Sequence, residues 1–152
     1  FLVSLPVQLG QIDAVPATVG IIGWIGAAIA IFGLIFECIA DWQLSQFKKD
    51  ASNKGKVMDR GLWGVSRHPN YLFEWIVWLA YPVIAIDLSG QWPAGWAALV
   101  APVVMYIILR YMTGVPPLEK VMLKSRGDAY RDYQSRVGAL LPRLNVFSKD
   151  RA

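Results

Sequence analysis

The chain has 152 residues, of which 55% are hydrophobic and 17% are charged, with a formal net charge of +4. Its length fits one domain, and its charges cluster between long uncharged runs, a pattern typical of a polytopic membrane protein. A lone cysteine, Cys38, excludes a disulfide framework. A lone histidine, His68, without a cysteine, histidine or carboxylate cluster at zinc spacing, argues against a metal site.

The N-terminal residues 1–9 are apolar but lack a basic lead-in, so they match a signal peptide poorly. We expect them to be the end of an earlier membrane helix, followed by a connection over residues 10–16. Residues 1–152 are accordingly predicted to form a single membrane domain that is the C-terminal part of a longer chain.

The first complete membrane span is predicted over residues 15–40. Residues 15–36 carry no charge, and at about 1.5 Å per residue they can cross a hydrocarbon core of about 30 Å. Small residues in this span would let a neighbouring helix approach closely. They are Gly20, Gly23, Gly26, Ala27, Ala30 and Gly33.

A polar stripe follows where this helix leaves the bilayer. Glu37, Asp41 and Lys48 fall within about 40° of one another around the helix axis. A solvated helix face and a polar cavity both account for the stripe, and the residues leave both interpretations open.

The next segment, residues 48–67, is predicted to be a loop with glycine and asparagine turns. Its six basic residues are Lys48, Lys49, Lys54, Lys56, Arg60 and Arg67.

Pro69 then suits the first turn of a helix, because its missing N–H would have no partner there. Asn70 and Glu74 share one face of that helix. Because a carboxylate in an apolar helix is costly in lipid, we interpret this pair as functional and not merely structural.

Two further membrane spans are predicted over residues 69–86 and 92–112, with a kink at Pro102. Trp92 and Trp96 suit the aromatic belt at a membrane surface.

Lysine and arginine are confined to two regions of the chain. All fifteen lie either between the first and second spans or after residue 109. Three crossings put both regions on one side of the membrane, and the positive-inside rule makes that side cytoplasmic. We therefore predict an all-α transmembrane helix bundle with a basic loop (residues 44–67) and an amphipathic helical tail (residues 114–152) in the cytoplasm.

The tail is predicted to form two helical stretches separated by a break at Gly127. Tyr130, Tyr133 and Val137 share one face, with arginines nearby. Such a tail can lie on anionic lipid, or it can fold over the cytoplasmic mouth of the bundle and bind an anionic cofactor. The residue pattern alone favours the lipid interpretation.

A site at the cytoplasmic end would be positive at its rim and apolar deeper in, which suits a charged cofactor and a lipid-like substrate. No Gly-x-Gly-x-x-Gly follows a strand, and neither a P-loop nor a Gly-x-Ser-x-Gly motif occurs. Rossmann, P-loop and hydrolase chemistry are therefore unsupported. Nucleic-acid binding is not expected, because membrane topology accounts for the basic residues.

Several motifs resemble those of one known family. In order, they are Ala40-Asp-Trp-Gln-Leu, Asn53-Lys-Gly-Lys, Gly61-Leu-Trp-Gly-Val-Ser-Arg-His-Pro-Asn-Tyr-Leu-Phe-Glu, Leu118-Glu-Lys and Tyr130-Arg-Asp-Tyr-Gln-Ser-Arg. Over residues 6–143 the chain resembles the bacterial membrane family related to steroid 5-alpha-reductases. The resemblance implies a multi-helix membrane protein that uses NADPH to reduce an activated C=C bond in a lipid-like substrate, such as a steroid or isoprenoid enone.

The resemblance also implies site residues. By position, Asn70 and Glu74 correspond to a catalytic Asn-x-x-x-Glu pair that borders the nicotinamide and the substrate. The implied cofactor-binding residues are Glu37, Asp41, Lys48, Lys56, Arg67, His68, Arg126, Tyr130, Tyr133 and Arg136. The implied location is a bacterial inner membrane, with membrane lipids as partners.

Two alternatives stay open. A membrane methyltransferase of the isoprenylcysteine or phospholipid type, using S-adenosylmethionine, also has an Arg-His-Pro-x-Tyr stretch. Such enzymes commonly carry a Glu-Glu pair in the tail, where this chain has Glu119 followed by Lys120. A catalytically silent lipid-binding protein is the other alternative.

Overall fold

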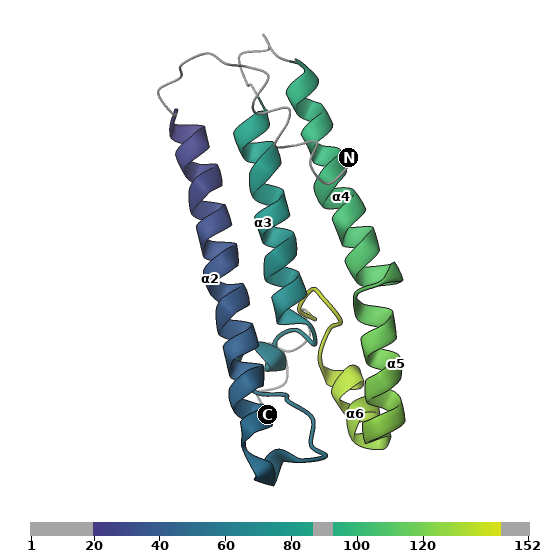
Figure 1. Ribbon diagram of the computed structural model, residues 1–152. Coiled ribbons are helices and arrows are strands. Elements are labelled where there is room, and N and C mark those ends of the chain that lie inside the picture. The colour runs from purple at the N-terminus through teal and green to yellow at the C-terminus, as the bar shows by residue number, and fades with distance from the viewer. Residues whose placement is uncertain (1–19, 87–92, 144–152) are drawn as a thin grey trace, which may run out of the picture.

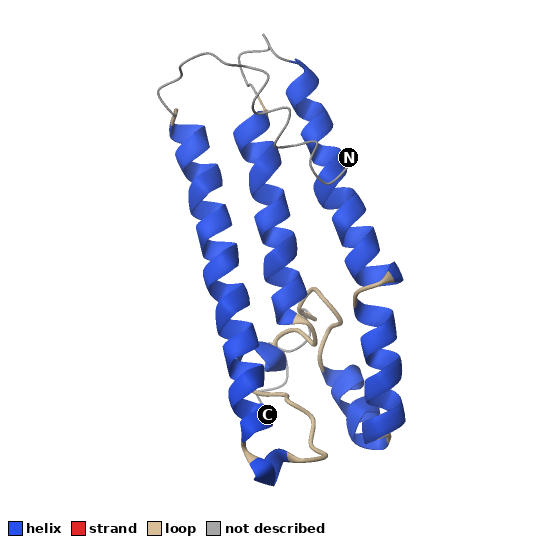
Figure 2. Ribbon diagram, in the orientation of Figure 1, coloured by secondary structure: helices blue, strands red, loops and turns tan. Residues whose placement is uncertain are grey.

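Three long helical segments lie side by side, with a loop and a short helical tail gathered at one end (Figure 1). The computed structural model describes residues 20–86 and 93–143. The predicted residues 1–9, 10–16 and 15–19, and Trp92, lie outside this range. Within it the structure contains helices and no strand, so the all-α prediction is confirmed (Figure 2).

The first described helix, α2 (Ile21–Lys49), packs along α3 (Pro69–Ala85). Its buried residues are Gly26, Gly33 and Ala40, spaced seven apart as in a coiled-coil seam. A Cβ atom at Gly33 would lie 2.9 Å from the carbonyl oxygen of Phe73, so only glycine permits this approach. The expectation that small residues bring a neighbouring helix close is therefore confirmed at Gly26 and Gly33.

Large apolar side chains cover the outer faces of the helices. Ile21 is 80% exposed and Trp24 is 67% exposed on α2, and Val103 is 59% exposed further along the chain. Continuous apolar surface of this kind is unfavourable in water. Two helical stretches, Ile21–Lys49 and Pro93–Arg126, are long and apolar enough to cross a membrane. The fold is thus a helical membrane bundle.

The middle helix, α3, has 17 residues and is about 26 Å long. Pro69 occupies its first turn, as predicted. Because α3 is shorter than the two membrane-spanning candidates, its assignment as a further span stays a prediction.

The third long segment is irregular. It begins with 3-10 turns (Pro93–Leu99), continues as α4 (Val100–Ile107) and ends in a π-helical turn (Ile108–Met112). Pro102 lies in the first turn of α4, where a missing N–H is tolerated. The visible break comes between α4 and α5, after the π-helical turn (Figure 1), and a kink at Pro102 stays a prediction.

The tail forms α5 (Val115–Arg126) and α6 (Asp128–Arg136), with Gly127 between them at a φ of 54°. This positive φ favours glycine, and the predicted break is confirmed. Tyr130, Tyr133 and Val137 form a small buried core, against which Val57, Met122 and Leu123 pack. The apolar face of α6 therefore packs inside the protein and not on lipid, while contact of the rest of the tail with lipid stays a prediction.

Candidate functional site

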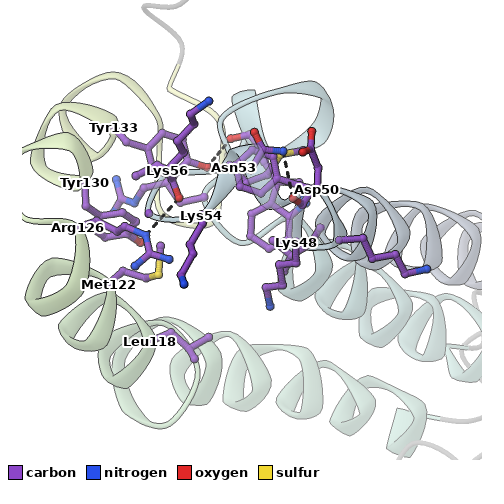
Figure 3. Close-up of a pocket in the computed structure, with 18 of the residues that line it drawn as sticks. Lys48, Asp50, Asn53, Lys54, Lys56, Leu118, Met122, Arg126, Tyr130 and Tyr133 are labelled. Atoms are coloured by element: carbon purple, nitrogen blue, oxygen red, sulfur yellow. Dashed lines mark hydrogen bonds between the residues drawn. The ribbon is translucent and has the colours of Figure 1, made fainter.

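A cavity of about 710 Å³ lies at the end of the bundle where the loop meets the tail, a volume typical of small-molecule sites. One wall is the end of α2, and the opposite wall is formed by α5 and α6 (Figure 3). The apolar part of its lining comes from both walls and from the loop, and includes Leu44, Phe47, Val57, Met58, Trp63, Leu118 and Met122.

Basic residues surround this apolar interior. They are Lys48, Lys49, Lys54, Lys56, Arg67 and Arg126. Of the described residues that line the cavity, Asp50 is the only acid, and hydrogen bonds from Ser52 lower the pKa of its carboxyl group. Asp50 is therefore ionised at neutral pH, yet the lining keeps a clear excess of positive charge. Such a surface attracts anionic groups.

The loop is held in place by hydrogen bonds to the helices on both sides. Trp63 Nε1 donates to the carbonyl oxygen of Ala40 at 3.0 Å, and the backbone N–H of Leu62 donates to Gln43 Oε1 at 3.0 Å. The Tyr133 hydroxyl donates to the carbonyl oxygen of Trp63. Trp63 thus joins α2 to α6 across the cavity wall.

Arg67 ties the end of the loop to the tail. Its Nε donates to Glu119 Oε1 at 2.6 Å, and its guanidinium also donates to the carbonyl oxygens of Gln134 and Val137. Its backbone N–H donates to the carbonyl oxygen of Gly138 at 2.9 Å. The guanidinium lies in the cavity wall and bonds to these protein groups, so the role that the structure shows is to attach the tail to the loop. Its predicted contact with a cofactor stays a prediction.

Glu119 completes this junction. Its second oxygen accepts a hydrogen bond from Gln134 Nε2 at 2.9 Å. Burial by itself raises the pKa of Glu119, but His68 and Arg67, which both approach Oε1, outweigh burial and lower the pKa to about 2. Glu119 is therefore an anion throughout the physiological pH range. It was not among the predicted site residues, because its partner Arg67 lies 52 residues away in the sequence and no spacing rule connects the two.

Two tyrosines of α6 complete the wall of the cavity on the tail side. Burial is the main cause that raises the pKa of Tyr130 to about 12, and the nearby Glu119 carboxylate adds to the effect. Burial also raises the pKa of Tyr133. Both side chains stay protonated at neutral pH and can act as hydrogen-bond donors.

His68 and Asn70 line the membrane side of the cavity. Within the described part of the chain, Asn70 Oδ1 is a buried atom without a hydrogen-bond partner. His68 Nε2 is also buried and forms no hydrogen bond, but it lies 3.4 Å from Glu119 Oε1. The His68 ring stacks on Tyr71, with ring centroids 5.8 Å apart and planes inclined by 13°. Unpaired buried polar atoms are unfavourable and are often explained by a ligand or by function.

Some predicted residues do not line the cavity. Glu37 and Glu74 are partly buried on α2 and α3, and Asp41 is exposed on α2. Asp41 lines a second hollow together with Lys48. Arg136 bonds to Asp132 and Asp59 outside the cavity. The cavity lining brings together the other predicted residues: Lys48, Lys56, Arg67, His68, Asn70, Arg126, Tyr130 and Tyr133. Glu74 nevertheless lies one helical turn after Asn70 on α3, so it follows directly on the last residue of α3 that lines the cavity.

Comparison with known proteins gives a family and few functional clues. The profile of DUF1295, described as a protein of unknown function, matches residues 1–137. The chain is 26% identical over 167 residues to the uncharacterized protein C594.04c of Schizosaccharomyces pombe, covering 95% of this chain and 46% of that protein. It is 44% identical over 46 residues to the probable O-methyltransferase ustE of Ustilaginoidea virens, covering 30% of this chain and 16% of that protein.

No solved structure matches the chain. The chain spans less than half the length of both relatives. Because the family profile covers most of the sequence, the chain belongs to DUF1295, a steroid 5-alpha-reductase-like family of unknown function.

Proposed function

We propose that this chain carries the cofactor-binding part of a membrane-embedded, NADPH-dependent reductase, which acts on an activated C=C bond of a steroid or isoprenoid enone. The observation that carries the proposal is the cavity of about 710 Å³, with a basic lining toward the loop and the unpaired Asn70 at its membrane side. This polarity suits a ligand with phosphates at one end and a neutral, hydrogen-bonding ring at the other.

The basic residues fit the phosphate groups of NADPH. Lys54, Lys56 and Arg126 lie near one another by the tail, and Lys48 lies at the end of α2 across the cavity (Figure 3). Arg126 Nε donates to the carbonyl oxygen of Lys56 at 3.2 Å, which holds these two basic residues together. Charge-assisted hydrogen bonds from such groups are stronger than neutral ones.

Asn70 and Glu74 fit the reacting end. NADPH, when bound, supplies the hydride that adds to the β-carbon of the enone. The side-chain amide of Asn70 has unused hydrogen-bonding capacity, and Glu74 lies one turn further into the membrane. Together they would orient the nicotinamide amide and the substrate carbonyl. Such orientation contributes most when the reacting atoms are held about 3–3.5 Å apart.

A methyltransferase is the second candidate, and the 44% identity over 46 residues to a probable O-methyltransferase favours it. The two candidates differ in the cofactor that should copurify. Mass spectrometry of the full-length protein, purified in mild detergent, should detect NADP(H). Detection of S-adenosyl compounds would support the methyltransferase instead. If neither NADP(H) nor an S-adenosyl compound copurifies, the result would support a silent lipid-binding protein.

We further propose that the protein resides in a bacterial inner membrane and that the cavity opens to the cytoplasm. The basic loop and tail lie at the same end of the bundle (Figure 1), and the positive-inside rule assigns that end to the cytoplasm. A soluble cofactor would then enter from the cytosol, and a lipid-like substrate from the bilayer.

A further inference from the structure

Glu119 contacts three segments of the protein at once. Its carboxylate bonds to Arg67 at the end of the loop and to Gln134 on α6, and it is itself part of α5. Its side chain is only 15% exposed. Arg67 also has two backbone carbonyl partners, so the tail is not held by the carboxylate alone.

His68 faces the same carboxylate oxygen that Arg67 contacts. His68 Nε2 lies 3.4 Å from Glu119 Oε1, and its side chain is 6% exposed. The backbone N–H of His68 donates to Ser66 Oγ at 3.2 Å, and its ring stacks on Tyr71. The ring therefore has a fixed place in the cavity wall.

The charge of Glu119 affects the relative energy of the two neutral forms of the His68 ring. An ionised carboxylate can only accept hydrogen bonds, and the pKa of about 2 keeps Glu119 ionised. Nε2 lies 3.4 Å from Oε1 and makes no hydrogen bond to it, but at this distance a lone pair on Nε2 would be repelled by the anion. A proton on Nε2 is attracted instead, and Nδ1 becomes the nitrogen that is free to accept a hydrogen bond or a proton.

We propose that Glu119 is a positioning residue that holds His68 with its proton on Nε2, so that the ring presents a defined Nδ1 acceptor to a ligand. The structural observation is the approach of Nε2 to Oε1 in a wall that also lines the cavity. The role in ligand binding rests on the proposed function, because the ligand is taken to be NADPH.

The test uses His68 as a spectroscopic probe, since the chain contains one histidine. The full chain is labelled with ¹⁵N-histidine in detergent, and the pH is raised until the imidazole is neutral. The two ¹⁵N chemical shifts then report which nitrogen is protonated. We expect Nε2 to be protonated in the wild-type protein without any nucleotide. A spectrum with the proton on Nδ1 would overturn the proposal even if no variant folded.

Two variants separate positioning of His68 from attachment of the tail. Arg67→Met removes the arginine contacts but keeps the Glu119 carboxylate, so Nε2 should remain protonated. Arg67→Met/Glu119→Met also removes the carboxylate without leaving a lone buried charge, which is often tolerated. The double variant should show a mixture of both protonated forms. An unchanged spectrum in the double variant would contradict the proposal.

Binding of NADPH provides the second readout. The double variant should bind NADPH about tenfold more weakly than Arg67→Met, as expected for losing one oriented hydrogen bond. Equal affinities of these two variants would show that Glu119 has no positioning role in binding. If wild-type protein binds no NADPH, the proposed function fails, while the spectra still decide whether Glu119 fixes the ring of His68.

Discussion

Glu74 is the residue whose change most directly tests the reductase proposal. Replacement by glutamine keeps its size and hydrogen bonding, so Glu74→Gln should fold normally. Turnover should fall by about a hundredfold or more, as for the loss of one well-placed polar group in an active site. NADPH oxidation with an enone lipid, measured beside thermal stability of the full-length protein, checks this. Asp128→Asn, which changes an exposed carboxylate of the tail, is the control and should stay active.

A structural role for Glu74 gives a different result. If the carboxylate only packs the α2–α3 seam, Glu74→Gln should lower the melting temperature and leave turnover near the wild-type value. That pattern would count against the assignment of Glu74 to the reaction centre.

Arg126 tests whether the basic lining binds phosphates or only lipid. Arg126→Ala should weaken NADPH binding by about tenfold, since a charge-assisted hydrogen bond is lost. Membrane insertion should be unaffected. Lys124→Ala is the matched control, because Lys124 lies on the same helix and is not among the residues lining the cavity. Reduced liposome association with unchanged NADPH affinity would identify Arg126 as a lipid contact. Isothermal titration in detergent measures the NADPH affinity, and vesicle flotation measures the liposome association.

The ion pair of Glu119 predicts a defined loss of stability in acid. Its pKa in the folded protein is about 2, compared with an ordinary value of 4.5. The stabilisation is therefore complete above pH 4.5 and is lost as pH falls through about 2. Its size should be about 1–2 kcal/mol, because the Glu119 side chain keeps 15% of its surface exposed and solvent screens part of the interaction. Thermal unfolding across this pH range should show this loss of stability in wild-type protein. An equal loss in Glu119→Gln would show that the Glu119 ion pair is not its cause.

At the scale of elements, the α2–α3 seam depends on a close approach at Gly33. Gly33→Leu would force a side chain into space that Phe73 and Val77 occupy, and overpacking of this kind costs about 1–3 kcal/mol. We expect a lower melting temperature in detergent. Ala28→Leu, at an exposed position of the same helix, is the control and should change it little. Equal melting temperatures for the two variants would mean that the helices do not pack as described.

The sequence allowed the helices and their faces to be predicted, because both depend on local periodicity. The break at Gly127 and the shared face of Tyr130, Tyr133 and Val137 were predicted from neighbouring residues alone. The partner of that face could not be predicted, since Val57 lies far away in the sequence. The Arg67–Glu119 contact was missed for the same reason: any of several acids could have paired with Arg67, and spacing does not choose among them.

The candidate site was predicted in the same partial way. Basic residues of the loop and tail were expected to meet at one end of the bundle, and Lys48, Lys56 and Arg126 do line one cavity. Glu37 and Asp41 share a helical stripe with Lys48, yet neither lines this cavity, and Asp41 lines a separate hollow with Lys48. Helical periodicity gives the direction of a side chain but not the depth at which a cavity ends.

At the scale of the whole molecule, the proposed topology places Ser52 and Ala94 on opposite sides of the membrane. In a Cys38→Ser background, Ser52→Cys should react with a membrane-impermeant thiol reagent only from the cytoplasmic side. Ala94→Cys, at the start of the predicted third span, should react only from the other side. Both positions are exposed on the protein surface. Labelling of Ser52→Cys in intact cells would contradict the topology.

The contacts of Arg67 also impose an order on biosynthesis. Its partners Glu119 and Val137 lie 52 and 70 residues further along the chain. During translation, Arg67 therefore has neither of these partners until the tail has left the ribosome. A product that stops between α3 and α5 would keep this exposed charge beside its membrane helices. Such a product would be a natural substrate for membrane quality control, so truncation should reduce protein abundance before it affects catalysis.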